Sequence, residues 1–177
     1  MAAILITGAN QGIGYHLTVA LLRQGHQVAV LDWETHHLAA LQNTFPAQLA
    51  YYPVDVRQGE ALQAAVAAAQ AWQGTPEVVI HNACCCPFGG VEALDLAQVQ
   101  AAFATNYYGA LQLVRCVGPA LRAQGRGLAR RLFYPRFLLC HSLLQKVQTL
   151  LCYAFPLPMG SLLAKLTARY QGHLPTP

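Results

Sequence analysis

A glycine-containing loop, Thr7–Gly14 with the sequence TGANQGIG, is the first stretch of the chain whose residues could carry chemistry. It lies between an apolar run and a segment with helical periodicity, an order that places backbone N–H groups and the positive end of a helix dipole against a phosphate. Gly8 permits the tight turn, Gly12 lets a pyrophosphate approach the backbone, and Gly14 lets strand and helix pack closely. The pattern predicts a dinucleotide-binding loop, although glycines in strand–helix turns also serve as turns alone.

An acidic residue, Asp32, ends the next apolar run, 18 positions after Gly14. A carboxylate at this place accepts hydrogen bonds from the adenosine ribose hydroxyls and repels a 2′-phosphate. Trp33 and Glu34 follow, and neither is a cation that would bind that phosphate. The sequence therefore favours NAD over NADP as the cofactor.

Alternating strand and helix patterns predict an α/β fold for the first part of the chain. The expected strands are residues 2–7, 27–32, 49–56 and 77–82, and the expected helices are 12–24, 36–45, 58–72 and 94–121. In the last of these helices, Gly109 and Pro119 are the expected interruptions. Such alternation implies right-handed crossovers and a Rossmann-like, doubly wound parallel sheet, here with strand order 3-2-1-4.

Three further motifs follow the loop in order: Asp55-Val56 after the third expected strand, His81-Asn82-Ala83-Cys84 after the fourth, and Asn106 in the last helix. Together with TGANQGIG, they resemble the short-chain dehydrogenase/reductase family over residues 1 to about 125. That family has Thr-Gly-x-x-x-Gly-Ile-Gly in the loop, Asp-Val after the third strand, Asn-Asn-Ala-Gly after the fourth, and an asparagine in the fourth helix.

The resemblance implies an NAD-dependent oxidoreductase that acts on a small-molecule alcohol or carbonyl substrate. It places pyrophosphate at the glycines, ribose at Asp32 and adenine at Asp55 and Val56. It also implies one catalytic residue, Asn106, which would hold the water or backbone that supports a proton relay. The cofactor-binding residues that it implies are Gly8, Asn10, Gln11, Gly12, Ile13, Gly14, Asp32, Asp55, Val56, Asn82 and Ala83.

Two residues depart from the family pattern inside this region. Cys84 stands in place of a glycine close to the cofactor, and His81 replaces the first asparagine. His81 and Cys84–Cys86 also suggest a metal site, but structural zinc sites space their ligands by two to four residues. We therefore expect packing at the end of a strand and no metal.

The resemblance stops after residue 125, before the family's Ser-Ser and Tyr-x-x-x-Lys segments. In the family, one helix face carries the tyrosine and the lysine, so the ammonium lowers the pKa of the phenol that acts as general acid or base. Here the residues four places before Lys146 and Lys165 are Ser142 and Ser161, and no tyrosine has a lysine at this spacing. The chain is thus expected to be a truncated form without the catalytic pair, and a non-catalytic nucleotide-binding or interaction module is the alternative.

Charge and composition separate the two parts of the chain. Residues 1–95 have a net charge of −5, whereas residues 96–177 have a net charge of +9 and no acidic residue. We therefore expect a dinucleotide-binding domain over 1–125 and a divergent, irregular or partly helical basic tail over 126–177. The absence of a signal peptide pattern, together with six cysteines, indicates reduced thiols in the cytoplasm.

Partners follow from the same composition. The tail lacks aromatic platforms and a basic helical face, so we expect no nucleic acid. Its one long uncharged window, Val147–Ala164, contains prolines and polar residues, so we expect no membrane span. The family commonly pairs through later helices, and the sequence leaves oligomerisation open.

Our hypothesis for the tail is a shifted reading frame from about residue 128 onward, with an authentic divergent tail as the rival. Loss of resemblance, loss of acids and the prolines near the end (Pro156, Pro158, Pro175 and Pro177) are what a shifted frame would produce. Sequencing the coding DNA across codons 120 to 145 tests this. One inserted or missing base that restores Ser-Ser and Tyr-x-x-x-Lys is the expected result, and an intact frame contradicts the hypothesis.

Overall fold

Four parallel strands form the centre of the fold, in the order β3-β2-β1-β4. The computed structural model describes residues 1–87, 92 and 94–125. The strands are β1 (Ala3–Thr7), β2 (Gln27–Asp32), β3 (Leu49–Pro53) and β4 (Val78–His81), and the helices between them are α1 (Gly12–Arg23), α2 (His36–Thr44) and α3 (Gly59–Gln73). This confirms the predicted Rossmann-like parallel sheet and its strand order. The predicted tail, residues 126–177, lies outside the described residues.

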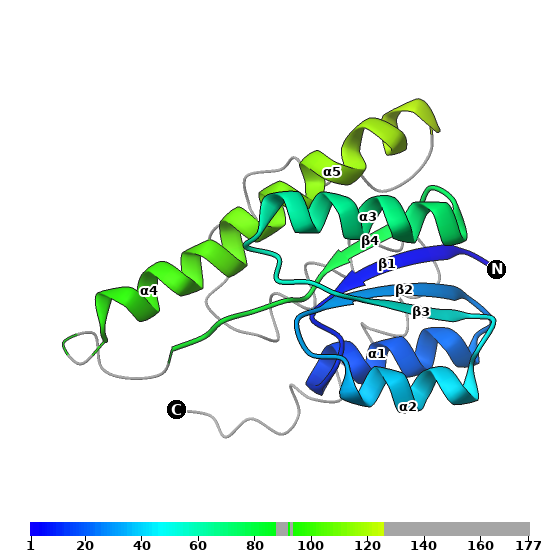
Figure 1. The fold of residues 1–177 in the computed structure, drawn as a ribbon, viewed down its shortest axis with the longest axis horizontal. Coiled ribbons are helices and arrows are strands. Elements are labelled where there is room, and N and C mark those ends of the chain that lie inside the picture. The colour runs from blue at the N-terminus through cyan, green and yellow to red at the C-terminus, as the bar shows by residue number, and fades with distance from the viewer. Residues whose placement is uncertain (88–91, 93, 126–177) are drawn as a thin grey trace, which may run out of the picture. The chain divides into compact units, whose positions relative to one another are not determined.

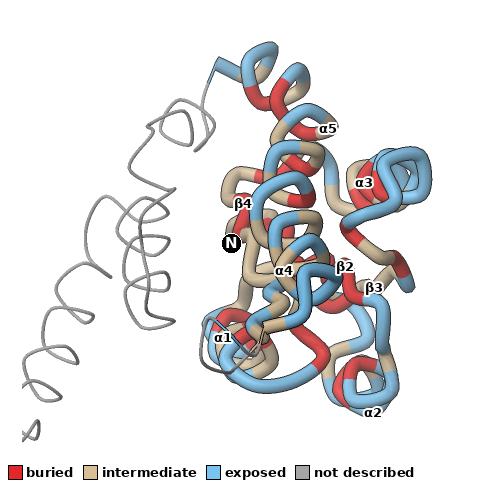
Figure 2. The backbone as a smooth tube through the Cα atoms, turned by 90° about the vertical axis from the view of Figure 1, so that its left-hand side faces the viewer, coloured by how far each residue is buried: buried red, intermediate tan, exposed pale blue. Residues whose placement is uncertain are grey.

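Helices cover both faces of the sheet (Figure 1). α1 and α2 lie on one face, whereas α3 and α5 (Ala110–Ala123) lie side by side on the other. α1, α2, α3 and α5 each bury one stripe of residues, and Figure 2 shows buried stretches alternating with exposed ones along these helices. Since side chains alternate across a strand, each strand supplies apolar residues to both layers and must be apolar throughout.

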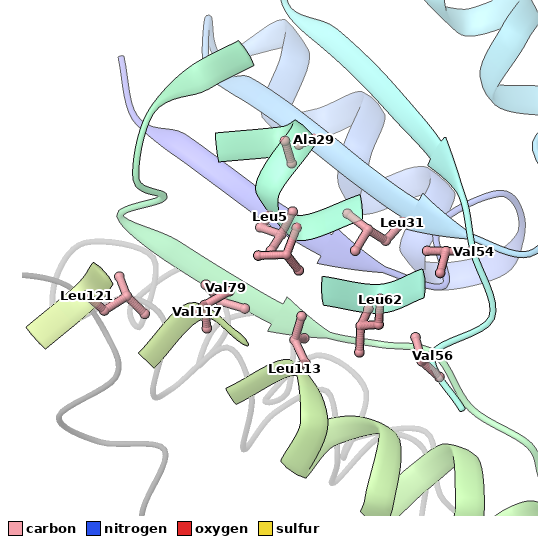
Figure 3. Close-up of a cluster of buried hydrophobic side chains, with 12 residues drawn as sticks. Leu5, Ala29, Leu31, Val54, Val56, Leu62, Val79, Leu113, Val117 and Leu121 are labelled. Carbon is pink, nitrogen blue, oxygen red and sulfur yellow. The ribbon is translucent and has the colours of Figure 1, made fainter. Parts of the chain in front are cut away.

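The core under α3 and α5 is a single cluster of aliphatic side chains (Figure 3). Leu5 of β1 lies in register with Ala29 of β2 and Val79 of β4, so the three point to the same face of the sheet. Leu62 of α3 and Leu113 of α5 pack against this row. Burying a leucine side chain contributes roughly 1.5–3 kcal/mol, so this layer fixes α3 and α5 on the sheet.

The predicted end of the third strand is wrong. β3 ends at Pro53, three residues before the predicted end at Val56. The backbone makes one further bond to β2, from Val54 N–H to the Asp32 carbonyl at 2.8 Å, and then turns. A bond from Gln58 N–H to the Asp55 carbonyl, 3.0 Å, closes that turn and leaves Asp55 and Val56 in a loop.

The helix predicted over 94–121, with interruptions at Gly109 and Pro119, is confirmed in part. The structure has α4 (Leu96–Phe103), then a π-helical segment η2 (Ala104–Gly109), then α5. Gly109 ends η2, but Pro119 lies inside α5 without ending it. A π-helical turn holds an extra residue and changes the direction of the side chains within it, and such turns are frequent at functional sites.

Leu113 and Leu111 provide a matched test of this core. Leu113 is buried and Leu111 is exposed on the same helix, two positions apart. Leu113→Ala is expected to lower the free energy of unfolding by about 2–5 kcal/mol. Leu111→Ala is expected to change it by less than about 0.5 kcal/mol. Urea unfolding followed by circular dichroism measures both, and equal losses in the two variants would contradict the packing.

Candidate functional site

The loop from Thr7 to Gly14 joins β1 to α1 at the carboxyl edge of the sheet. Gly8 has φ +67°, a left-handed conformation that favours glycine, and a Cβ there would lie only 2.6 Å from the Ala83 nitrogen. Gly12 also has a positive φ, +59°, but a Cβ there would meet no described atom within 4 Å. The two glycines therefore differ: Gly8 is required by close contact with the segment after β4, whereas Gly12 borders open space.

The first turn of α1 is open to a ligand. Gln11 precedes the helix with extended backbone, and among the described residues no side chain caps the turn and no acidic residue lies within it. The N–H groups at the start of a helix lack intrahelical acceptors, and they favour an anion. Gln11, Gly12 and Ile13 are exposed, so a ligand can approach the start of the helix.

Gly14 lies where α1 crosses the segment after β4. A Cβ at this buried glycine would overlap the Asn82 side-chain nitrogen and the Gly8 carbonyl. Asn82 Nδ2 donates a hydrogen bond to that same carbonyl. The Asn82 side chain thus connects the end of β4 to the loop after β1, and its amide nitrogen is engaged with protein backbone.

The Thr7 hydroxyl is shared by three hydrogen bonds. Its oxygen accepts from Asn82 N–H at 3.1 Å and from Ala83 N–H at 3.2 Å, and it lies 3.0 Å from His81 Nδ1. A hydroxyl has two acceptor lone pairs and one donor, so Thr7 must donate to Nδ1. His81 is therefore the neutral tautomer protonated on Nε2, and Nε2–H donates to the Thr105 carbonyl at 3.3 Å.

The environment of His81 opposes a second proton on its ring. Burial lowers the pKa of His81 to about 4, and the hydrogen bond to the Thr105 carbonyl opposes this only in part. A proton on Nδ1 would also turn the ring into a second donor facing a Thr7 oxygen whose lone pairs are both used. His81 consequently works here as a neutral link between β1, β4 and η2.

Asp32 is buried at the end of β2, with 6% of its surface exposed. Its carboxylate accepts hydrogen bonds from Asn10 N–H at 2.7 Å and from Glu34 N–H at 3.2 Å. A carboxylate offers about four acceptor sites, so further donors can still bind. The Asn10 side chain turns away toward α2, where its oxygen accepts from His37 N–H at 3.0 Å.

Asp55 and Val56 have different surroundings although they are adjacent. Asp55 is paired with Arg57, whose Nη2 lies 2.6 Å from Oδ2, and this hydrogen bond holds the pKa of the Asp55 carboxyl below its usual value. The Val56 side chain is buried in the core, where it faces Gly109 so closely that a Cβ on Gly109 would lie 2.9 Å from it.

Asn106 lies in the middle of η2 and bonds to Cys85 in both directions. Its Oδ1 accepts from Cys85 N–H and its Nδ2 donates to the Cys85 carbonyl, each at 2.8 Å. The asparagine side chain thus pairs with the backbone after β4 as a strand would. Within the described residues, Asn106 positions this segment through both ends of its amide group.

The fold brings the sequence-predicted residues to one edge of the sheet. Because the four strands are parallel, their carboxyl ends meet, and the predicted cofactor residues lie at the last residue of β2, in the loops after β1, β3 and β4, and in the first turn of α1. Ser142 and Ser161, and the tyrosines and lysines of the tail, lie outside the described residues. In the described part of the chain, no group of three His, Cys, Asp or Glu side chains is arranged for a metal ion, and no helix is long and apolar enough to cross a membrane.

Sequence reasoning missed Thr7 and Arg57. The signal for Thr7 is its place as the first residue of the glycine motif, where a side-chain hydroxyl can bond to neighbouring loops. Arg57 follows Asp55 by two positions, and a short turn brings such side chains together. His81 was expected to pack, and its bonds to both Thr7 and Thr105 are tertiary.

Comparison with known proteins places these residues in a family context. The family model described as short chain dehydrogenase matches residues 2–129. Over 127 residues the chain is 32% identical to ketoacyl reductase HetN of Nostoc sp., a match that covers 70% of this chain and 44% of that protein. It is 30% identical over 131 residues to retinol dehydrogenase 8 of Bos taurus, covering 70% of this chain and 41% of that protein. The chain thus spans less than half the length of these relatives.

Solved structures agree with the fold. A short-chain dehydrogenase from Streptomyces avermitilis superposes with a TM-score of 0.67 at 26% identity, covering 71% of this chain and 46% of that one. Serine dehydrogenase from Escherichia coli superposes with a TM-score of 0.65 at 23% identity, covering 71% of this chain and 58% of the other.

His81 generates a pH prediction. The folded pKa of about 4 lies below the usual 6.5, so the unfolded chain binds this proton first as the pH falls. The contribution of His81 to the free energy of unfolding is therefore fully present above about pH 6.5. It is lost as the pH falls from 6.5 to 4, by up to about 3 kcal/mol. His81→Asn is expected to flatten this decline, apart from the smaller slope from His26, whose pKa burial also lowers. Urea unfolding at several pH values measures it.

Exposed His16→Asn is the matched control and should retain the full pH dependence. An unchanged slope in His81→Asn would show that the ring does not titrate as its contacts imply.

Proposed function

Since the chain belongs to the short-chain dehydrogenase/reductase family, whose members bind NAD(P), we propose that it binds NAD at the carboxyl edge of its sheet. The observation that carries the proposal is the open space beside Gly12 at the uncapped start of α1. A pyrophosphate at that place would meet backbone N–H groups and the positive end of the helix dipole. Asn10, Gln11, Ile13 and Gly14 complete the loop that surrounds it.

Asp32 supports NAD over NADP. Its carboxylate keeps acceptor sites beyond those used by Asn10 and Glu34, and these can bind the two ribose hydroxyls. The Asn10 N–H bond fixes the carboxylate next to the glycine loop. A 2′-phosphate would bring two negative charges against a buried carboxylate, which is unfavourable without a nearby cation.

For the adenine ring, we propose Asp55 and the backbone of Val56. The Val56 side chain is buried, so only its main-chain groups can reach a ligand. Asp55 already accepts from Arg57, and an adenine amino group would share that carboxylate. Asn82 and Ala83 would line the nicotinamide side of the site. The Asn82 side chain would contribute indirectly, by holding in place the Gly8 carbonyl to which it donates a hydrogen bond.

The proposed reaction class is oxidoreduction of an alcohol or carbonyl compound. NAD supplies the site that accepts or donates hydride. Asn106 positions the segment after β4 through Cys85, and we assign it the family's supporting role in the proton relay. The printed sequence has no tyrosine with a lysine four places later, so we propose that this polypeptide binds the cofactor without turnover. This sequence feature also supports the second candidate, a non-catalytic nucleotide-binding or interaction module.

Location and partners complete the proposal. We propose a cytoplasmic location, where NAD is present and structural disulfides are rare. The partner of the complete enzyme is a small alcohol or carbonyl compound, and pairing with a second copy stays open.

Ligand-dependent stabilisation tests the NAD site. At about one hundred times its Kd, NAD should stabilise the full chain by about 2.7 kcal/mol, visible as a rise in Tm. NADP should give a much smaller rise. Asp32→Ala should remove most of the NAD-dependent rise, in addition to lowering the Tm of the free protein, since Asn10 and Glu34 N–H lose their acceptor.

Glu34→Gln is the matched control, because this adjacent carboxylate is exposed, and its NAD-dependent rise should equal that of the unaltered chain. The same preparation should form no NADH from a panel of alcohols. An equal NAD effect in Asp32→Ala would contradict the site, and NADH formation would contradict binding without turnover.

A further inference from the structure

Three consecutive cysteines follow Ala83, and the outer two lie together. Cys84 Sγ and Cys86 Sγ are 2.9 Å apart, and both residues are exposed. Cys85 lies between them in the chain and is half-buried. The proposed nucleotide site uses none of these thiols.

Hydrogen bonds hold the backbone of this segment before Cys84 and at Cys85. Asn82 N–H and Ala83 N–H bond to the Thr7 hydroxyl, and both the N–H and the carbonyl of Cys85 bond to Asn106. The backbone before and between the two cysteines is therefore fixed by contacts with β1 and η2.

We propose that Cys84 and Cys86 form an oxidisable dithiol that closes to an intramolecular disulfide with a low-molecular-weight disulfide such as glutathione disulfide. The thiolate of one cysteine attacks the small disulfide, forms a mixed disulfide and releases one thiol. The second cysteine then attacks the protein sulfur of the mixed disulfide and releases the second thiol. The protein loses two protons and two electrons, and the small disulfide gains both.

The distances and exposure suit this reaction. A disulfide bond is about 2.0 Å long, so the two sulfur atoms must approach by about 1 Å from their 2.9 Å separation. Exposure gives the oxidant access, and exposed disulfides are the ones that thiols reduce again. The site is thus suited to reversible oxidation.

Oxidation should also affect the cofactor, a consequence that rests on the proposed function. Cys84 follows Ala83, whose backbone lies against Gly8 and bonds to Thr7. Closing the disulfide would pull on this tightly packed backbone beside the glycine loop that is proposed to bind NAD. The oxidised chain should therefore show a smaller NAD-dependent rise in Tm than the reduced chain.

Mass spectrometry of the full chain tests the disulfide without any cofactor. The reduced protein is incubated with glutathione disulfide, quenched in acid, alkylated and digested without reduction. The peptide containing Cys84–Cys86 should lose the mass of two hydrogen atoms and carry one alkyl group, on Cys85. Cys85→Ser, the matched control, should close in the same way, whereas Cys84→Ser and Cys86→Ser should instead retain a glutathione adduct on the remaining partner.

Alkylation of all three cysteines, or a link through Cys85, would overturn the proposed disulfide. If the reduced chain shows an NAD-dependent rise and the closed disulfide shows an equal one, the effect on the cofactor is wrong while the disulfide stands. If neither form responds to NAD but the disulfide forms, the proposed function fails and the dithiol site remains.

Discussion

The close approach of the loop after β1 to the segment after β4 is the constraint on which the rest of the site depends. The two backbones are so near at Gly8 and Ala83 that only glycine is accommodated at the first position. Parallel pairing of β1 with β4 imposes this proximity, since Thr7 and His81 are register partners at the ends of their strands. The backbone hydrogen bonds between β1 and β4 end at this pair. Beyond it, the Thr7 hydroxyl connects the two segments by accepting hydrogen bonds from Asn82 N–H and Ala83 N–H.

Polar side chains at this edge mostly bind protein backbone. Asn82 donates to Gly8, Asn10 accepts from His37, and Asn106 pairs with Cys85. Buried polar groups must be hydrogen-bonded, and loops between strands and helices leave many N–H and carbonyl groups without ladder partners. These asparagines therefore shape the site, while the groups left to meet a ligand are backbone N–H groups of α1 and the remaining acceptor sites of Asp32.

The π-helical segment joins the site to the core. Gly109, at its end, lies against Val56, whose side chain belongs to the aliphatic layer under α3 and α5. Thr105 accepts from His81 and Asn106 bonds to Cys85, so one turn of helix contacts the core and the segment after β4 together. A change at either place would move the other, because packed interiors deform little.

The sequence by itself determined the parallel sheet, its order and the loop that follows β1. Those features depend on local periodicity and on glycines whose conformational freedom is intrinsic to the residue type, and both can be read along the chain. The exact ends of elements were predicted less well: β3 ends at Pro53, and the π-helical segment η2 lies between α4 and α5.

Only the tertiary structure decided what the polar residues contact. That Asn106 bonds to Cys85, that Val56 turns inward and that His81 lies between Thr7 and Thr105 each depends on residues distant in sequence. Residue type indicates what a side chain can donate or accept, but its partner is set by which strands pair and which helices pack above them.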